Sequence, residues 1–255
     1  MEQYYELWSD MMVAGEDLAF WQTFFVKFYQ AFIEADRWKQ YLEGVGTTLL
    51  VTAMALAMGV ALGIIVAIIR TAHDQQRPGN KNFLLGIVDR ICRIYVTVIR
   101  GTPMMVQLLI MGMVIFSSSR NFTMIGAVTL GINSGAYVAE IIRGGLMALD
   151  RGQMEAGRSL GLGYVDTMRF IIVPQAFKAE QPALGNAFIV LLKETSLIPV
   201  IGGKELVNAA QGIYNRTYEQ MFPLMGVACI YLALVVILTK LLDIFERRLR
   251  QGDRH

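Results

Sequence analysis

The sequence predicts an all-α, polytopic membrane protein with five transmembrane helices. Of its 255 residues, 55% are hydrophobic and only 17% are charged, whereas soluble domains average about 25% charged residues. The apolar residues gather in long runs, and about 20 such residues span the hydrocarbon core as a helix. The net charge of +2 is too small to indicate a nucleic-acid partner, and the two cysteines form no Cys-x-x-Cys motif. No metal site or disulfide framework is therefore predicted.

The first predicted element is an N-terminal amphipathic helix in the outer membrane interface. Apolar residues, nearly all of them aromatic, recur at helical spacing from Phe20 to Ile33, and polar residues, Lys27 among them, occupy the opposite face. The alternative is a sixth span that ends at Ile33, but this stretch is short and has Lys27 at its centre. We therefore assign residues 1–42 to an extracellular segment that contains this interfacial helix.

Five longer segments follow as predicted spans, and they cover residues 44–69, 94–119, 121–149, 182–202 and 221–239. The first has no charged residue, and its Gly59-x-x-x-Gly63 pair suits close helix packing. Pro103 is expected to kink the second span. The third has a face of small residues from Gly131 to Gly135. Together the spans predict a transmembrane domain over residues 43–246.

The distribution of basic residues predicts the orientation. The first-to-second loop, the third-to-fourth loop and the tail over residues 247–255 are basic, whereas the N-terminal segment is acidic. The positive-inside rule then places the N-terminus outside and the C-terminus in the cytosol. The basic residues of the three cytosolic segments are Arg70, Arg77, Lys81, Arg90, Arg93, Arg151, Arg158, Arg169, Arg247, Arg248, Arg250 and Arg254. The two histidines, His73 and His255, lie in polar segments and are expected to be solvated.

A polar helix–turn–helix pattern lies in the second cytosolic loop. Helix-forming residues run from Met154 to Leu160, and Gly161 then supplies a sharp turn because glycine tolerates positive φ. Apolar helical spacing resumes over residues 164–173, and Pro174 is expected to end that helix. A short amphipathic helix at this position suits the docking of a soluble partner.

This loop resembles the EAA loop of the permease subunits of ABC importers. The family's pattern is Glu-Ala-Ala, three residues, Gly, nine residues and Ile-x-Leu-Pro, and the spacing fits throughout. Two positions differ, because Gly157 replaces an alanine and Val173 replaces a leucine. Gly157 should weaken the first helix by roughly 1 kcal/mol. The resemblance implies that the loop contacts an ATPase through Glu155, Ala156, Gly157, Arg158 and Gly161.

Two further stretches resemble the permeases of polar amino acid ABC importers. Residues 100–107 are similar to their Arg-Gly-Thr-Pro-x-x-Val-Gln sequence, and the third span has a related stretch over residues 135–145. In that stretch Glu140 and Arg143 are three residues apart and can pair on one helix face. We expect the first stretch to form the inner end of the second span, with Arg100, Gly101, Thr102 and Pro103.

Charged residues inside the fourth span are candidates for a substrate pathway. If this helix starts at Pro182, Lys193 lies ~17 Å along it, near the midplane. A charge at that depth is costly and usually faces a pathway or a partner. Residues 193–197 also resemble a stretch of the same permeases, and they can meet both charged groups of an amino acid. The alternative is a charge network between two permease subunits. The candidate pathway residues are Lys193, Glu194, Thr195, Ser196, Asn133 and Tyr137.

These stretches together resemble the transmembrane permease subunit of a polar amino acid ABC importer, in the family of binding-protein-dependent transport system inner-membrane components. The resemblance implies a bacterial cytoplasmic membrane protein that works with a second permease subunit, the same chain or a homologue. It also implies two ATP-binding subunits and an extracellular substrate-binding protein. The chain has no P-loop, so ATP should be bound and hydrolysed on the partner, with no cofactor and no catalytic residue here.

Two other classes of function were considered. A self-sufficient secondary amino acid transporter would show more ionisable residues within the membrane and two related halves, and neither is visible. A membrane enzyme would need a nucleophile with a base. Ser196 and Lys193 are the one conceivable dyad, and no oxyanion site accompanies them.

Overall fold

The computed structural model describes residues 1–76 and 82–251, and all regular elements in that part of the chain are helices. The predicted all-α membrane class is therefore confirmed. Within the described residues, four helical segments are long and apolar enough to cross a membrane, namely Glu34–Asp74, Phe122–Ala148, Tyr164–Ile201 and Met221–Arg248. A fifth span results if the bent pair Phe83–Gly101 and Met104–Ile115 is counted as one.

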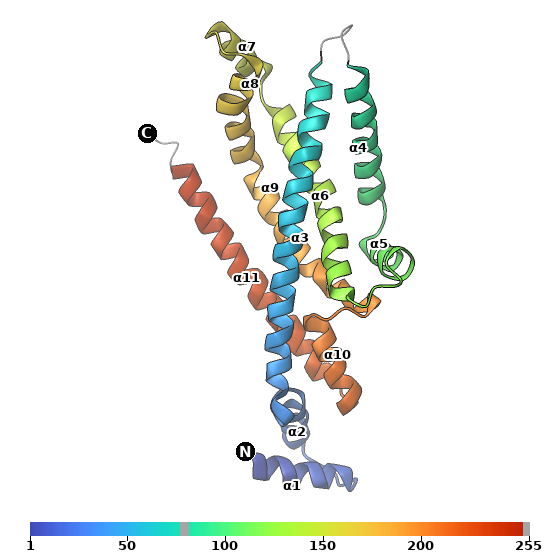
Figure 1. Ribbon diagram of the computed structural model, residues 1–255. Helices are drawn as coiled ribbons and strands as arrows, with labels where there is room; N and C mark the ends of the chain where they lie inside the picture. The colour runs from blue at the N-terminus through green and yellow to red at the C-terminus, as the bar shows by residue number, and fades with distance from the viewer. Residues whose placement is uncertain (77–81, 252–255) are drawn as a thin grey trace.

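Helices α3 (Arg37–Asp74) and α6 (Phe122–Ala148) pack side by side at the centre of the bundle (Figure 1). A Cβ atom added to Gly59 would lie 2.7 Å from the Cβ of Ser134, and one added to Gly63 would lie 2.6 Å from the Cβ of Val138. Real Cβ atoms do not approach so closely, so the predicted glycine pair permits the contact. The third span is also confirmed, since it differs from the predicted range by one residue at each end.

The second span differs from its prediction. Helix α4 (Phe83–Gly101) begins at Phe83 rather than Ile94, and a 108° bend separates it from α5 (Met104–Leu109) and the π-type segment η2 (Ile110–Ile115). Residues 100–103 therefore lie at the C-terminal end of α4 and at the bend, rather than near the start of the span, and their position at the inner end stays a prediction. The prediction failed because Arg93, which resembles a loop residue in the sequence, pairs with Asp74 of α3 at 2.8 Å as well as with Asp89 of its own helix at 2.7 Å.

The fourth span is longer than predicted. It runs without interruption through α8 (Tyr164–Thr167), the π-type segment η3 (Met168–Ile172), α9 (Val173–Glu194) and the 3₁₀ segment η4 (Thr195–Ile201). The predicted break at Pro174 and start at Pro182 are therefore wrong. Pro174 lies where the π-type segment η3 passes into α9, and the helix continues past it. Lys193 consequently lies eight residues before Ile201, about 15 Å from this end, because Thr195–Ile201 is a 3₁₀ segment with the larger rise of about 2.0 Å per residue. Its position near the membrane midplane stays a prediction.

Helix α11 (Met221–Gln251) forms the fifth span, and α10 (Leu206–Thr217), which was not predicted, precedes it. Because α11 continues past Thr239, Arg247 and Arg248 extend a helix rather than form a separate tail. The predicted limits of the transmembrane domain likewise fall inside α3 and α11. Residues Arg77, Lys81, Arg254 and His255 lie outside the described residues, as does the Arg250 side chain.

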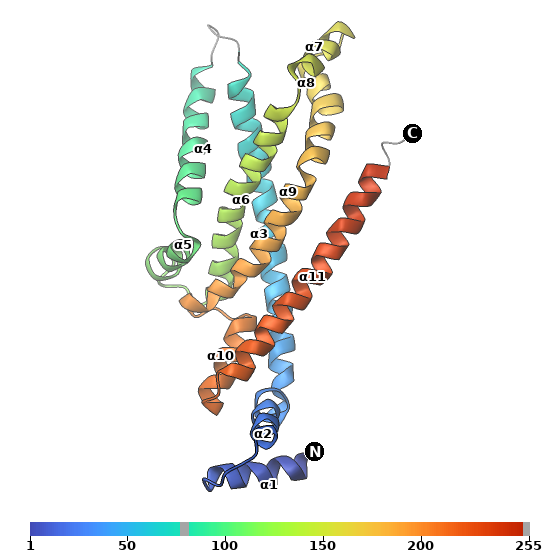
Figure 2. The ribbon, with the colours of Figure 1, turned by 180° about the vertical axis from the view of Figure 1, so that it is seen from behind.

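The N-terminal helices lie across the end of α3. Both α1 (Glu2–Val13) and α2 (Phe20–Phe32) run crosswise to α3 in two views, and the short segment η1 (Glu34–Asp36) joins them to it (Figures 1 and 2). Helix α2 is held by an ion pair of 2.7 Å between Lys27 and Glu219. Its 13 residues are too few for the alternative sixth span. An interfacial position for these helices remains a prediction.

Candidate functional site

The loop between α6 and α9 forms a short helix, α7 (Arg151–Ser159), at the end of the bundle opposite α1 (Figure 1). It begins before the predicted Met154, because the Asp150 carboxylate accepts a hydrogen bond of 2.9 Å from the Gly152 N–H and so caps it. After α7, Gly161 has a φ of +82°, and the Leu162 N–H donates to the Gly157 carbonyl at 3.0 Å. The positive φ predicted for Gly161 is confirmed.

Gly157 has a packing role that the sequence did not reveal. A Cβ atom at this position would lie 2.5 Å from Cγ2 and 3.1 Å from Cβ of Thr167 on α8. Thr167 is fully buried, and its hydroxyl donates to the Gly163 carbonyl at 2.9 Å. The glycine that departs from the family pattern therefore lets α7 and α8 pack closely together.

The loop is attached to the core and exposes apolar side chains. The Tyr164 hydroxyl donates a hydrogen bond to the Gln75 side chain at the end of α3. A cavity of about 460 Å³ lies between the loop and this end of α3, with Glu155 and Arg158 among its lining residues. Leu160 remains 78% exposed and Val165 70% exposed. A partly apolar projection of this kind suits a protein partner.

The break after α4 is held by Gln107. Its side-chain nitrogen donates to the carbonyls of Ile99 at 2.7 Å and Thr102 at 3.1 Å, carbonyls that the end of the helix leaves without helical partners. Its side-chain oxygen accepts from Asn133 of α6 at 3.0 Å. The Gln107 of the Arg-Gly-Thr-Pro stretch therefore fixes the bend and joins it to α6.

Three of the six predicted pathway residues line one cavity. This cavity, of about 340 Å³, lies between α6 and α9 and includes Asn133, Tyr137 and Glu194. Asn186 and Ser134 add polar groups that were not predicted. Among the described lining residues Glu194 is the only charged one. The cavity can therefore take a small polar molecule that carries a cationic group.

The other three predicted residues do not line this cavity. Lys193 is exposed, and the Ser196 hydroxyl donates to the Lys193 carbonyl at 2.7 Å rather than facing the Lys193 amine, so the conceivable dyad is not formed. Thr195 is buried, and its hydroxyl lies 3.1 Å from that of Tyr231. The hydroxyls of Thr195 and Ser196 therefore bind groups at the helix end and Tyr231 rather than lining this cavity.

Tyr231 leads to a buried carboxylate that sequence reasoning missed. Glu205 is 1% exposed. It accepts hydrogen bonds from the Tyr231 hydroxyl at 2.8 Å, the Thr48 hydroxyl at 3.4 Å and the Asn208 N–H at 3.0 Å. Burial raises the pKa of the Glu205 carboxyl above its ordinary value. Glu205 thus joins α3, α10 and α11, and in the sequence it appeared only as a loop residue.

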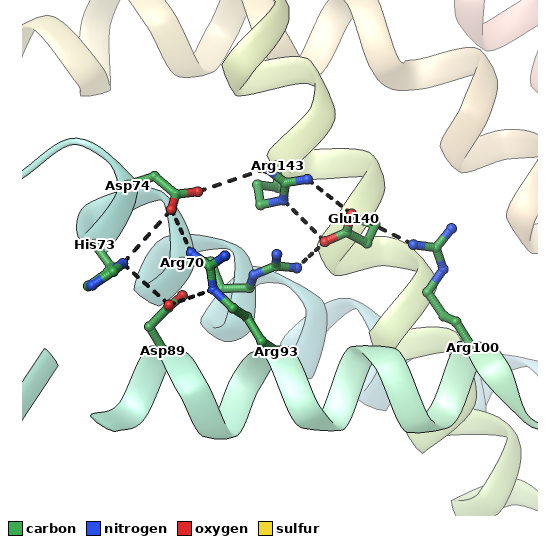
Figure 3. Close-up of polar contacts among 8 residues, drawn as sticks. All are labelled: Arg70, His73, Asp74, Asp89, Arg93, Arg100, Glu140 and Arg143. Atoms are coloured by element: carbon green, nitrogen blue, oxygen red, sulfur yellow. Dashed lines mark hydrogen bonds and ion pairs between the residues drawn. The ribbon is translucent and has the colours of Figure 1, made fainter. Parts of the chain in front are cut away.

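A cluster of charged residues joins α3, α4 and α6, and Figure 3 shows its members. Arg143 pairs with Glu140 through two hydrogen bonds of 3.1 Å, which confirms the predicted pair. Arg70 also binds Glu140, while Arg93 binds Asp74 at 2.8 Å.

The position of His73 corrects the expectation that both histidines are solvated. Its Nδ1 lies 3.3 Å from Asp89 inside this cluster. The sequence placed the residue in a polar segment and gave no sign of the carboxylate from α4.

Comparisons with known proteins find a matching family and similar sequences. Residues 80–251 match the family described as binding-protein-dependent transport system inner membrane component. The arginine transport system permease protein ArtQ of Bacillus subtilis is 37% identical over 187 residues, which cover 67% of this chain and 84% of that protein. The glutamine transport system permease protein GlnP of Escherichia coli K12 is 34% identical over 213 residues, covering 82% and 92%.

A solved structure has the same architecture. The crystal structure described as an amino acid ABC transporter with histidines is 39% identical, with a TM-score of 0.73 over 82% of this chain and 94% of that chain.

Proposed function

The chain belongs to the family of binding-protein-dependent transport system inner membrane components and is the permease component of an amino acid ABC importer. We propose that a polar amino acid crosses it through the cavity that Glu194 lines. The family membership favours this role over a self-sufficient secondary transporter and over an enzyme. Such a permease lies in the cytoplasmic membrane and works with an ATP-binding subunit and a substrate-binding protein, and ATP is hydrolysed on the separate subunit.

The observation that carries the proposal is the lining of this cavity. Glu194 offers a carboxylate to the substrate ammonium, and Asn133 and Asn186 offer amides that both donate and accept hydrogen bonds. Asn133 also binds Gln107 at the bend. The cavity wall is therefore connected to the segment after Pro103, and a movement of the bend would change the cavity.

We propose that α7 couples this cavity to the ATP-binding subunit. Glu155, Ala156 and Arg158 are exposed and are available to the partner, and Gly157 and Gly161 shape the loop. The Tyr164–Gln75 hydrogen bond passes a displacement of the loop to α3. Because α3 packs along α6, which lines the cavity, the displacement reaches the substrate.

The finer arrangement is also a proposal. The N-terminus lies outside and the C-terminus in the cytosol, with α1 and α2 in the outer interface. Two ATP-binding subunits act on two permease subunits, the second being the same or a homologous chain. The exposed apolar side chains along α4 and α11 suit lipid or that second permease. The substrate-binding protein docks at the end that carries α10.

The test is uptake by the reconstituted complex with its ATP-binding subunit and binding protein. Arginine and glutamine are the first substrates to try, since the named relatives carry them. Glu194→Gln should lower uptake about tenfold or more, because a charged hydrogen bond contributes about 1.5–3 kcal/mol. The exposed Glu43 supplies the matched control, Glu43→Gln. Unchanged uptake by Glu194→Gln would refute the proposed pathway, and ATP-independent uptake would refute the importer assignment.

A further inference from the structure

The charged cluster in Figure 3 contains more positive than negative groups. Its members include four guanidinium groups, from Arg70, Arg93, Arg100 and Arg143, and three carboxylates, from Asp74, Asp89 and Glu140. One positive charge is therefore not balanced within the cluster, apart from any charge on His73. Guanidinium groups remain charged in proteins, and an unbalanced charge within a membrane protein is costly. The cluster accordingly favours the entry of an anion.

A cavity provides the room for that anion. It measures about 310 Å³ and is lined by Arg70, Arg93, Arg100, Glu140, Thr97 and Val96. This volume is close to the lower end of the range for small-molecule sites, about 300 Å³. The side chains of Arg93 and Arg100 are 48% and 41% exposed, so an anion that enters the cavity can reach their guanidinium groups.

Arg100 is the arginine best placed to change partners. Its contact with Glu140 is long, at 3.6 Å, and both oxygens of Glu140 already accept hydrogen bonds from Arg143. The Arg100 guanidinium lies 5.2 Å from the centre of the Tyr137 ring, and Tyr137 lines the cavity of Glu194. The arginine cavity and the Glu194 cavity are thus neighbours that meet at the Arg100–Tyr137 contact.

We propose that the arginine cavity binds the carboxylate of the transported amino acid and is a second substrate-binding site next to the Glu194 cavity. The proposal rests on the proposed import function. A guanidinium and a carboxylate form two parallel hydrogen bonds, and a carboxylate that replaces Glu140 as the partner of Arg100 would neutralise the unbalanced charge. A lipid phosphate shares this oxyanion chemistry. The amino acid is favoured because the cavity adjoins the proposed pathway through Tyr137.

Binding measurements on the permease–ATPase complex, without binding protein, test the assignment. The complex is placed in nanodiscs of zwitterionic phosphatidylcholine and titrated with arginine and glutamine. The same titration uses their decarboxylated counterparts, agmatine and 4-aminobutanamide. The wild type should prefer the amino acids. Arg100→Gln should reduce this preference about 10- to 100-fold, whereas Arg120→Gln, at an exposed arginine outside the cluster, should leave it unchanged.

Two further variants separate the cavity from a general effect of charge. Arg100→Lys keeps the charge but cannot form two parallel bonds, so the preference should fall several-fold, and this variant decides the question if Arg100→Gln does not assemble. Thr97→Phe fills the cavity and should also lower the preference. Val98→Phe adds the same bulk at an exposed neighbour that does not line the cavity and should not.

Three outcomes would refute the proposed second substrate-binding site. The first is an undiminished preference in Arg100→Gln, or in Arg100→Lys where only that variant assembles. The second is an equal loss of affinity for the amino acids and their decarboxylated counterparts. The third is a preference that disappears when phosphatidylglycerol is added to the nanodiscs, which assigns the cavity to a lipid phosphate. By contrast, a wild-type complex that transports neither amino acid would refute the proposed function itself.

Discussion

Replacing Gly157 by alanine tests whether packing or helix propensity governs the loop that carries α7. Alanine is the residue that the family pattern has at this position. By propensity alone, alanine should stabilise α7 by roughly 1 kcal/mol relative to glycine. The structure predicts the opposite sign, because the added Cβ would lie 2.5 Å from Cγ2 of the buried Thr167.

The magnitude follows from the overlap between the two side chains. Carbon atoms normally approach to about 3.5–4.0 Å, so Gly157→Ala compresses this contact by about 1 Å. Overpacking of this kind costs about 1–3 kcal/mol. After the propensity gain is subtracted, the free energy of opening α7 should fall by about 0–2 kcal/mol, and local opening should become up to about 30-fold more frequent.

Hydrogen exchange of the α7 amides in nanodiscs measures this opening. Exchange should be faster in Gly157→Ala than in the wild type, and less ATP-binding subunit should copurify. Thr167→Ala provides the matched background, because only a Cβ then remains near position 157, at 3.1 Å. In that background, Gly157→Ala should slow exchange, since a small shift relieves the contact and the propensity gain remains.

The double-mutant cycle of Gly157→Ala and Thr167→Ala should therefore show an unfavourable interaction between the alanine at position 157 and the Thr167 side chain. Slower exchange in Gly157→Ala with Thr167 intact, by the roughly fivefold that propensity alone predicts, would refute the reasoning. So would an identical effect of Gly157→Ala in both backgrounds, because Thr167 would then play no part.

Three further predictions concern the turn, the buried carboxylate and the topology. Gly161→Val should insert into the membrane yet lose ATPase association and uptake, while Gly161→Asn, which tolerates positive φ, should keep both; equal activity of the two variants would exclude a conformational role. Because burial raises the pKa of Glu205, the folded state binds its proton more tightly than the unfolded chain, so thermal stability should fall as pH rises from about 4.3 through the raised value. Glu205→Gln should remove this slope, and a slope that survives the substitution has another source. In a variant without native cysteines, a cysteine at Met12 or Ser118 should react with an impermeant reagent in intact cells and one at Arg158 should not; the reverse pattern would invert the proposed topology.

The sequence by itself determined the class of the protein and the features that depend on local chemistry. Long apolar runs require a membrane, and the limits of α6 follow from such a run and from the Asn121 cap, whose side chain accepts a hydrogen bond of 3.1 Å from the Met124 N–H. The positive φ at Gly161 and the Glu140–Arg143 pair were likewise predictable, because each depends on residues within one turn or one helix.

Tertiary structure decided the features that depend on partners from other helices. Helix α4 could not be delimited from the sequence, because its charged residues are compensated by Asp74 of α3 and Glu140 of α6. The burial of the Glu205 carboxylate depends on hydroxyls from α3 and α11, which the sequence does not reveal.

The candidate site shows the same division. Glu194 lines the cavity and its neighbour Lys193 does not. Successive residues of a helix point about 100° apart, and the packing of α9 against α6 selects which of them faces the cavity. The sequence therefore identified the charged segment, and the fold chose the carboxylate within it.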